Sequence, residues 1–234
     1  MEELEQITEK TRRSFDLVAE KYFEDFKDEM KQKEYDRMLL DRFASGFDSR
    51  SIVCDVGCGP GHITRYLFDK GVNVFGIDVS EKCVEIARRE NPGMRFETMD
   101  MAKLDIADES LDGIVSFYSI IHTPRKFVNV LFREFYRVLR KRGKILVVVK
   151  KGETEGYIDE LEGFKTSLYF TNFKEGEIED YLKVNGFTVV SVKTRRPYDF
   201  EIPVDRIYAI GEKTALAPDT ATTSLTSALG FKTK

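Results

Sequence analysis

The beginning of the chain carries apolar residues at helical spacing. Two amphipathic helices are predicted there, over residues 3–28 and 29–47, and Gly46 is the expected stop of the second helix. Both helices precede the first apolar strand of the chain. We therefore expect residues 1–47 to form an N-terminal helical lid over a cleft.

Further along, short apolar runs alternate with amphipathic helical segments. Strands are predicted near residues 51–56, 72–77, 95–98, 111–117, 143–150, 187–194 and 204–213. Helices are predicted near residues 62–70, 80–91, 124–140 and 174–185. Alternation of this kind builds a mostly parallel sheet with helices on both faces, and such sheets bind ligands at the carboxyl ends of their strands.

The length and the composition divide the chain into three parts. Its 234 residues are enough for a single large core, which we place over residues 48–213. Residues 214–234 are rich in Thr, Ala and Ser and show no strong periodicity. We expect them to form a flexible C-terminal tail beyond the lid and the core.

The most informative stretch is an apolar strand that runs into a glycine-rich turn. Asp55 stands two residues before Gly57, and Gly59 and Gly61 follow at every second position. Glycine lets the backbone turn sharply and approach a ligand closely, and the helix that follows offers unpaired N–H groups to an anion. The turn is not a dinucleotide fingerprint, because His62 occupies the last glycine position, and it lacks the Gly-Lys-Ser/Thr of a P-loop.

The Asp-x-Gly-x-Gly-x-Gly pattern resembles the first motif of the class I S-adenosylmethionine (SAM)-dependent methyltransferases. Three later features follow in the order of that family: an apolar run that ends at Asp78, a short strand that ends at Asp100, and a strand and loop over residues 111–122. The resemblance covers about residues 10–213 and is greatest to a small-molecule branch with bacterial and archaeal members. It implies a doubly wound, mostly parallel, Rossmann-like seven-stranded sheet whose last strand is antiparallel and inserted between its two predecessors.

The resemblance also implies where SAM binds. The ribose hydroxyls would bind Asp78, the adenine amino group would bind Asp100, and Met101 would pack on the ring. A second interpretation of Asp78, as the cap of the helix that begins near Ser80, stays open. Cys58 is interpreted as a small residue that leaves room for the cofactor. The expected cofactor-binding residues are Tyr22, Asp55, Gly57, Cys58, Gly59, Gly61, Asp78, Val79, Asp100, Met101, Ser116 and Phe117.

The first predicted helix contains a second resemblance. Phe15, Asp16, Ala19 and Tyr22 reproduce the aromatic-Asp-x-x-Ala-x-x-Tyr pattern of many small-molecule methyltransferases. In those enzymes the second aromatic residue reaches the methionine end of SAM. Tyr22 is therefore expected to make that contact, and packing in a core is the alternative.

Catalytic groups are expected in the loop after the fourth strand. Methyl transfer from a sulfonium is an in-line displacement, so the protein has mainly to align the reactants and exclude water. Tyr118, Ser119 and His122 project from that loop, and we take His122 and Tyr118 as the candidate catalytic residues. His122 would act as a base near neutral pH, or it would cap the next helix or shape the pocket.

The composition and the absence of certain motifs disfavour several classes of partner and site. The net charge of −4 and the pI of about 5.5 disfavour a nucleic-acid surface, and residues 116–119 lack the Asn/Asp-Pro-Pro-aromatic motif of nucleic-acid N-methyltransferases. No apolar run has the length of a membrane span, and the acidic start is unlike a signal peptide. Three cysteines form no disulfide framework, and no carboxylate cluster predicts a metal site.

The sequence therefore predicts a cytoplasmic enzyme that transfers the methyl group of SAM to an O, N or S nucleophile of a small molecule. No nucleic-acid, membrane or metal partner is expected, and the protein would be a monomer or a homodimer. Two alternatives stay open. One is a SAM-binding regulatory or partner protein without transfer activity, and the other is an NAD-dependent oxidoreductase, which His62 and Asp55 disfavour.

Overall fold

The computed structural model describes residues 1–214. Its α-helices are α1 (Glu2–Phe26), α2 (Glu34–Ala44), α3 (His62–Asp69), α4 (Glu81–Glu90), α5 (Arg125–Val138) and α6 (Glu177–Val184), with short 3₁₀ helices η1 (Glu29–Lys31) and η2 (Ile120–His122). Its strands are β1 (Val53–Val56), β2 (Val74–Asp78), β3 (Phe96–Thr98), β4 (Leu111–Phe117), β5 (Leu139–Lys150), β6 (Glu155–Leu161), β7 (Phe164–Thr171), β8 (Phe187–Arg195) and β9 (Arg206–Lys213). The predicted tail lies, except for Thr214, outside the described residues.

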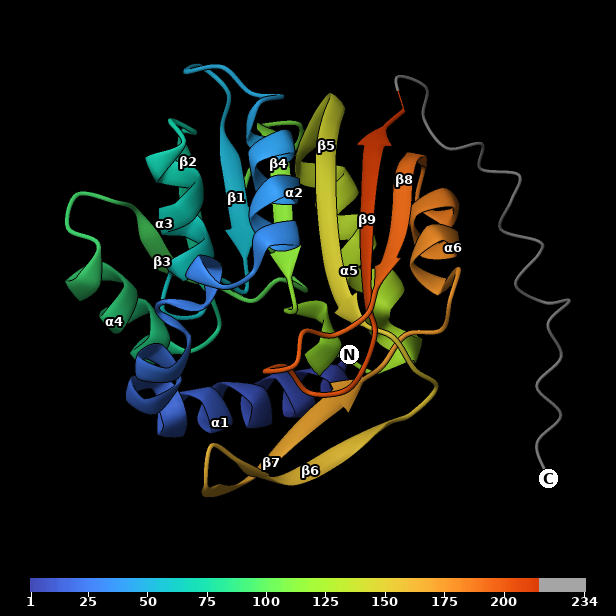
Figure 1. Cartoon of the computed structure of the whole chain (residues 1–234). Coiled ribbons are helices and arrows are strands. Elements are labelled where there is room, and N and C mark those ends of the chain that lie inside the picture. Colours follow the sequence, from blue (N-terminus) through green and yellow to red (C-terminus); the bar gives the residue numbers. More distant parts are fainter. Residues whose placement is uncertain (215–234) are drawn as a thin grey trace, which may run out of the picture.

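Seven of these strands form one twisted sheet in the order β3-β2-β1-β4-β5-β9-β8 (Figure 1). Strands β1 to β5 are parallel to one another, and β9 is antiparallel to both β5 and β8. The last strand thus lies between its two predecessors, and the predicted doubly wound α/β fold is confirmed.

Both faces of this sheet are buried, as its continuous apolar strands require. In β5, the side chains of Ile145, Val147 and Val149 pack in a cluster with α5 and α6. Those of Leu146 and Val148 point to the other face and pack with α2 and α3. Strand alternation therefore divides the core into two layers on either side of the sheet.

The two N-terminal helices lie in different places. Helix α1 crosses the edge of the sheet at the carboxyl ends of the parallel strands, whereas α2 packs on one face of the sheet (Figure 1). The second helix is also shorter than predicted, because the chain turns through η1 and Lys33 takes a non-helical conformation before α2 begins. Only α1 is thus placed over the carboxyl edge.

A β-hairpin that the sequence reading did not predict lies next to α1. Strands β6 and β7 pair antiparallel in a separate two-stranded sheet, and β7 lies against α1 (Figure 1). The turn is made by Glu162 and Gly163, both with positive φ (49° and 82°), which is the backbone of a type I′ hairpin turn. A Glu-Gly pair between two runs with aromatic residues was the available signal.

A substitution at Gly211 would test how tightly the inserted strand β9 packs against its neighbours. A Cβ at this position would lie 2.8 Å from Leu182 Cδ2 of α6 and 3.3 Å from Ile145 Cγ2. We expect Gly211→Val to lower the free energy of unfolding by about 1–3 kcal/mol, since overpacking forces neighbours to move. Gly156→Ala is the control, because the nearest atom, Phe170 Cε1, would lie 4.0 Å away. Equal denaturation midpoints for the two variants would contradict this packing.

Candidate functional site

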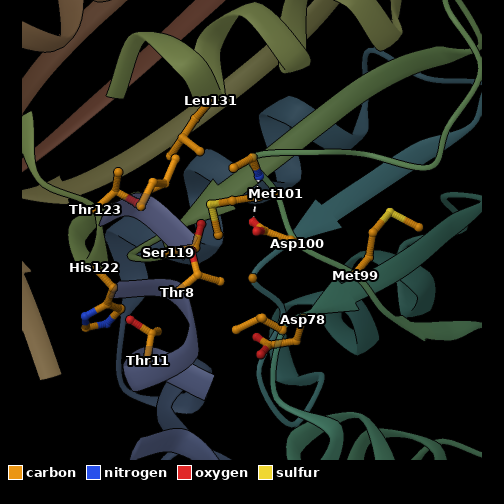
Figure 2. A pocket seen from close by; sticks show the side chains of 14 residues that line it. Thr8, Thr11, Asp78, Met99, Asp100, Met101, Ser119, His122, Thr123 and Leu131 are labelled. Atoms are coloured by element: carbon orange, nitrogen blue, oxygen red, sulfur yellow. Dashed lines mark hydrogen bonds between the residues drawn. The ribbon is translucent and has the colours of Figure 1, made fainter. Parts of the chain in front are cut away.

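One pocket opens at the carboxyl edge of the sheet, between the loops after β1 to β4 and helix α1 (Figure 2). Its volume is about 40 Å³, which is well below the roughly 300–1,000 Å³ of typical small-molecule sites. The residues that line it are Leu4, Thr8, Thr11, Gly57, Asp78, Val79, Met99, Asp100, Met101, Ala102, Ser119, His122, Thr123 and Leu131. Of the expected cofactor-binding residues, this set contains Gly57, Asp78, Val79, Asp100 and Met101.

The glycines of the turn after β1 have positive φ angles of 72°, 53° and 90° at positions 57, 59 and 61, but they meet different neighbours. A Cβ on Gly57 would lie 2.3 Å from Ser119 Cβ, and one on Gly61 would lie 2.9 Å from the Phe96 ring. At Gly59 the nearest atom would be Tyr22 Cε1, at 3.9 Å. Packing against the protein itself therefore demands glycine at 57 and 61, whereas Gly59 leaves space beneath the aromatic ring of α1.

Asp78 joins the turn to the next helix. Its Oδ2 accepts from the Gly59 N–H and its Oδ1 from the Ser80 N–H, both at 2.8 Å. The cap of α4 is Ser80, whose hydroxyl accepts from the Cys83 N–H at 3.1 Å, so the cap interpretation of Asp78 is wrong. Burial raises the pKa of Asp78, and these backbone hydrogen bonds oppose the rise. The remaining lone pairs of the carboxylate can accept from a ligand.

The far wall of the pocket combines one acid with apolar side chains. The Asp100 carboxylate accepts from the Ala102 N–H at 2.8 Å, and burial raises its pKa (Figure 2). Met99, Met101 and Leu131 line the same pocket. An acceptor oxygen beside an apolar wall suits a flat ring that carries an amino group.

Two expected residues of the glycine turn point into the core. Asp55 is buried and accepts from the Thr64 hydroxyl at 2.6 Å, and burial raises its pKa to about 6. The Sγ of Cys58 packs between β2 and α4 and would lie 2.8 Å from a Cβ on Gly76. The interpretation that Cys58 is small to leave room for a cofactor is therefore wrong, because its side chain faces away from the pocket.

At the end of β4, too, expected cofactor-binding residues point into the core. The hydroxyl of Ser116 hydrogen-bonds that of Ser119 at 2.7 Å in the interior, and Phe117 packs in the core layer beneath α2. Of these residues only Ser119 lines the pocket, and it does so while packing on Gly57. The side chains of Ser116 and Phe117 thus support the loop from below.

Tyr118 and His122 have separate surroundings. Tyr118 has a positive φ of 56°, and its buried hydroxyl faces that of Tyr208 without reaching hydrogen-bond geometry with any of residues 1–214. His122 lines the pocket, its Nδ1 donates to the Tyr169 carbonyl at 2.9 Å, and its ring meets the Phe15 ring edge to face. His122 therefore does not cap α5.

Burial lowers the pKa of His122 to about 4, because an enclosed imidazolium cannot be hydrated. The ring is therefore neutral near pH 7, and its role as a base stays a prediction. Since a carbonyl only accepts, Nδ1 carries the proton of the neutral ring, and Nε2 is left as an acceptor.

Helix α1 contributes pocket residues that the sequence reading missed. Leu4, Thr8 and Thr11 recur at helical spacing, and this small polar stripe was the available signal. Asp16 ties the helix to the core, because its Oδ1 accepts from the Ser80 hydroxyl at 2.7 Å. Tyr22 packs against Phe15 and Phe26 and faces the glycine turn.

Two kinds of feature are absent from the described residues 1–214. No group of three or more His, Cys, Asp or Glu side chains is placed to hold a metal ion there. No helix in that part of the chain is long and apolar enough to cross a membrane.

Comparison with known proteins identifies related chains. Residues 53–143 match the model of a methyltransferase domain. An uncharacterized methyltransferase of Anoxybacillus flavithermus is 24% identical over 161 residues, which are 63% of this chain and 74% of that protein. Phosphoethanolamine N-methyltransferase 3 of Arabidopsis thaliana is 36% identical over 100 residues, 41% of this chain but only 20% of its own length.

Solved structures agree in fold. The 1,6-didemethyltoxoflavin-N1-methyltransferase of Burkholderia thailandensis, with bound 1,6-didemethyltoxoflavin and S-adenosylhomocysteine, superposes with a TM-score of 0.67. The alignment covers 90% of each chain at 17% sequence identity. At this level of identity the likeness concerns the fold alone.

The raised pKa of Asp55 makes a prediction about stability. An acid whose pKa rises from 3.8 to about 6 on folding stabilises the fold below pH 4, and this contribution is lost as the pH rises through 6. Asp55→Asn keeps an acceptor for Thr64 and cannot ionise. We expect its free energy of unfolding, relative to the wild type, to increase by about 2 kcal/mol between pH 4 and pH 7.5.

Chemical denaturation at a series of pH values measures this difference. Asp105→Asn, at an exposed position, is the control and should show no such trend. A difference between Asp55→Asn and the wild type that does not change with pH would contradict the assignment.

Proposed function

We propose that this protein, which belongs to the class I SAM-dependent methyltransferases, transfers the methyl group of SAM to a small-molecule acceptor by in-line displacement. The observation that carries the proposal is the convergence of Gly57, Asp78 and Asp100 on one pocket at the carboxyl edge of the sheet. This is where open α/β sheets bind their ligands.

The residues present fit SAM as follows. The ribose hydroxyls would donate to Asp78, and the adenine would lie against Met101 with its amino group toward Asp100. The carboxylate would approach the turn over residues 57–61, where α3 begins. SAM, when bound, supplies an activated methyl group, so the protein has only to orient it and keep water out.

Helix α1 would act as the lid in this scheme. Its residues Leu4, Thr8 and Thr11 face the pocket, and Tyr22 lies over Gly59, where the methionine end of SAM would run. The hairpin β6–β7 supports the helix from its other side. We propose that α1 alone, rather than residues 1–47 as a whole, closes the site.

A small acceptor is favoured by what the relatives are named for. One relative is named for phosphoethanolamine, and one structural neighbour holds 1,6-didemethyltoxoflavin. The acidic chain, at a net charge of −4, is poorly suited to a nucleic-acid acceptor. We further propose a cytoplasmic protein, since Cys54, Cys58 and Cys83 are all free. A monomer or a homodimer remains our proposal for its assembly.

His122 would serve the acceptor as a neutral hydrogen-bond partner. Its Nδ1–H donates to the Tyr169 carbonyl, so Nε2 could accept a hydrogen bond from the methyl acceptor. That bond would orient the lone pair of the acceptor's nucleophilic atom toward the methyl carbon. Tyr118, at the start of the same loop, would also contact the acceptor.

The proposal is tested by calorimetry with SAM and with NAD, followed by a methyl-transfer screen against a metabolite library. Binding of SAM without NAD, together with transfer to at least one metabolite, is expected. Binding of NAD in place of SAM would overturn the assignment. SAM binding without transfer to any acceptor would favour the regulatory alternative.

Asp78 gives the sharpest prediction for the donor. Asp78→Ala leaves two ribose hydroxyls without an acceptor and also frees the Gly59 N–H, so the affinity for SAM should fall by about 1–3 kcal/mol. Isothermal titration measures this change. Asp180→Ala, an exposed substitution on α6 with the same change in charge, should bind like the wild type. Wild-type affinity in Asp78→Ala would rule out this binding mode.

The lowered pKa of His122 gives a prediction for turnover. Because the ring titrates near pH 4, kcat should show no step from His122 between about pH 5.5 and 7.5. His122→Asn should reduce kcat by about tenfold or more through lost alignment, with unchanged SAM affinity. A step near pH 6.5 in the wild type that this variant abolishes would instead show a titrating base.

A further inference from the structure

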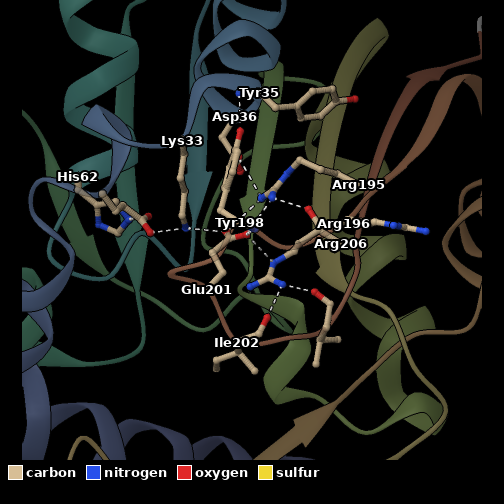
Figure 3. Close-up of polar contacts among 12 residues, drawn as sticks. Lys33, Tyr35, Asp36, His62, Arg195, Arg196, Tyr198, Glu201, Ile202 and Arg206 are labelled. Carbon is tan, nitrogen blue, oxygen red and sulfur yellow. Dashed lines mark hydrogen bonds and ion pairs between the residues drawn. The ribbon is translucent and has the colours of Figure 1, made fainter.

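A second polar site lies outside the pocket, on the face of the sheet that α2 covers. Within the described part of the chain, only two buried side-chain polar atoms lack a hydrogen bond, Tyr118 Oη and Arg206 Nε, and both belong to this region. The surrounding groups form a continuous network of charged side chains (Figure 3). Buried polar atoms without partners mark places where a ligand group can bind.

Most carboxylates of this network already pair with Arg195 or Lys33. Arg195 binds both oxygens of Glu201, at 2.8 and 3.0 Å, and also contacts Asp36 at 3.3 Å (Figure 3). Lys33 lies 2.5 Å from Glu29. Arg206 reaches Glu201 only at 3.5 Å, without a hydrogen bond from its Nε.

Lys150 adds a cation that forms no ion pair within the described part of the chain. It ends β5 and stands directly opposite Arg206 of β9 in the antiparallel register, so both side chains project from the same face. Among residues 1–214 its ammonium group makes no hydrogen bond or ion pair. Burial lowers the pKa of Lys150, and the charges of Arg206 and Lys33 lower it further, whereas the Glu201 carboxylate raises it. Two like charges across a strand pair destabilise each other unless an anion lies between them.

This region adjoins the donor pocket. Tyr118 directly precedes Ser119, which lines the pocket, and the Lys150 charge adds to burial in lowering the pKa of His122. His62, the residue after the glycine turn, contacts Glu29 at 2.8 Å, and Glu29 in turn contacts Lys33.

We propose that Lys150, Arg206 and Tyr118 bind an oxyanion group, a carboxylate or a phosphate, of the methyl acceptor. The inference rests on the proposed function for the identity of the ligand, but the anion site itself is independent of transfer. An oxyanion there would accept from the Tyr118 hydroxyl, from the Lys150 ammonium group and from Arg206 Nε. Nη1 of Arg206 already donates to the carbonyls of Ile202 and Val204. Charge-assisted hydrogen bonds of this kind are the strong ones in protein sites.

The test uses inorganic phosphate and acetate as probes on the full chain, with and without S-adenosylhomocysteine. Thermal unfolding is followed while each probe is titrated at constant ionic strength. Phosphate, acetate or both should raise the midpoint of the wild type, because a ligand that binds the folded state stabilises it. The stronger of the two probes identifies the oxyanion.

Matched variants separate binding from general salt effects. Lys150→Met keeps the length of the side chain but removes its charge, and it should lower the affinity for the probe at least tenfold. Lys150→Arg keeps the charge and should retain most of that affinity. Lys151→Met removes the neighbouring lysine, whose partner is Glu175 on the surface, and should respond like the wild type. Equal responses of Lys150→Met and the wild type would overturn the proposal, as would equal losses in both methionine variants.

The outcome is separable from that of the proposed function. If S-adenosylhomocysteine does not bind, the donor assignment fails, while the phosphate and acetate titrations of the free protein still decide on the anion site. With an acceptor found by screening, Lys150→Met should raise KM at least tenfold with little change in the affinity for SAM. An acceptor that carries no acidic group and keeps its KM in this variant would contradict the inference.

Discussion

The hydrogen bonds of the Asp78 carboxylate connect the segments on which the rest of the site depends. It accepts the Gly59 N–H from the turn after β1 and the Ser80 N–H at the start of α4. Ser80 then caps α4 with its hydroxyl and donates that hydroxyl to Asp16 of α1. One acid at the end of β2 thereby holds the glycine turn, the next helix and the covering helix in a single arrangement, with lone pairs left for a ligand.

Burial decides the charge of the groups around this carboxylate. Asp55 beneath the turn has its pKa raised to about 6, and His122 on the opposite wall has its pKa lowered to about 4. In both cases enclosure disfavours the charged form. The pocket at the carboxyl edge carries the acids Asp78 and Asp100, whereas Lys150 and Arg206 stand opposite each other at the end of β5. This division of charge underlies the anionic acceptor that we propose.

Much of the architecture could be predicted because it depends on local patterns. Strands near residues 53, 74, 96 and 111 follow from apolar runs, and the turn follows from glycines that only a positive φ explains. Asp78 and Asp100 were expected in the pocket because they end successive parallel strands, and such ends meet at one edge of a sheet. The hairpin β6–β7 escaped prediction since its strands are half exposed and pair only with each other.

The sequence by itself determined the fold class, the order of the motifs and the acids that face the pocket, because these depend on periodicity and on the position of a residue along its own strand. Only the tertiary structure decided which way side chains in a turn point, which separated the buried Asp55 and Cys58 from the pocket-lining Gly57. It also decided the protonation of His122 and the pairing of Lys150 with Arg206. Burial and cross-strand register arise from contacts between residues far apart in the chain, and no local pattern encodes them.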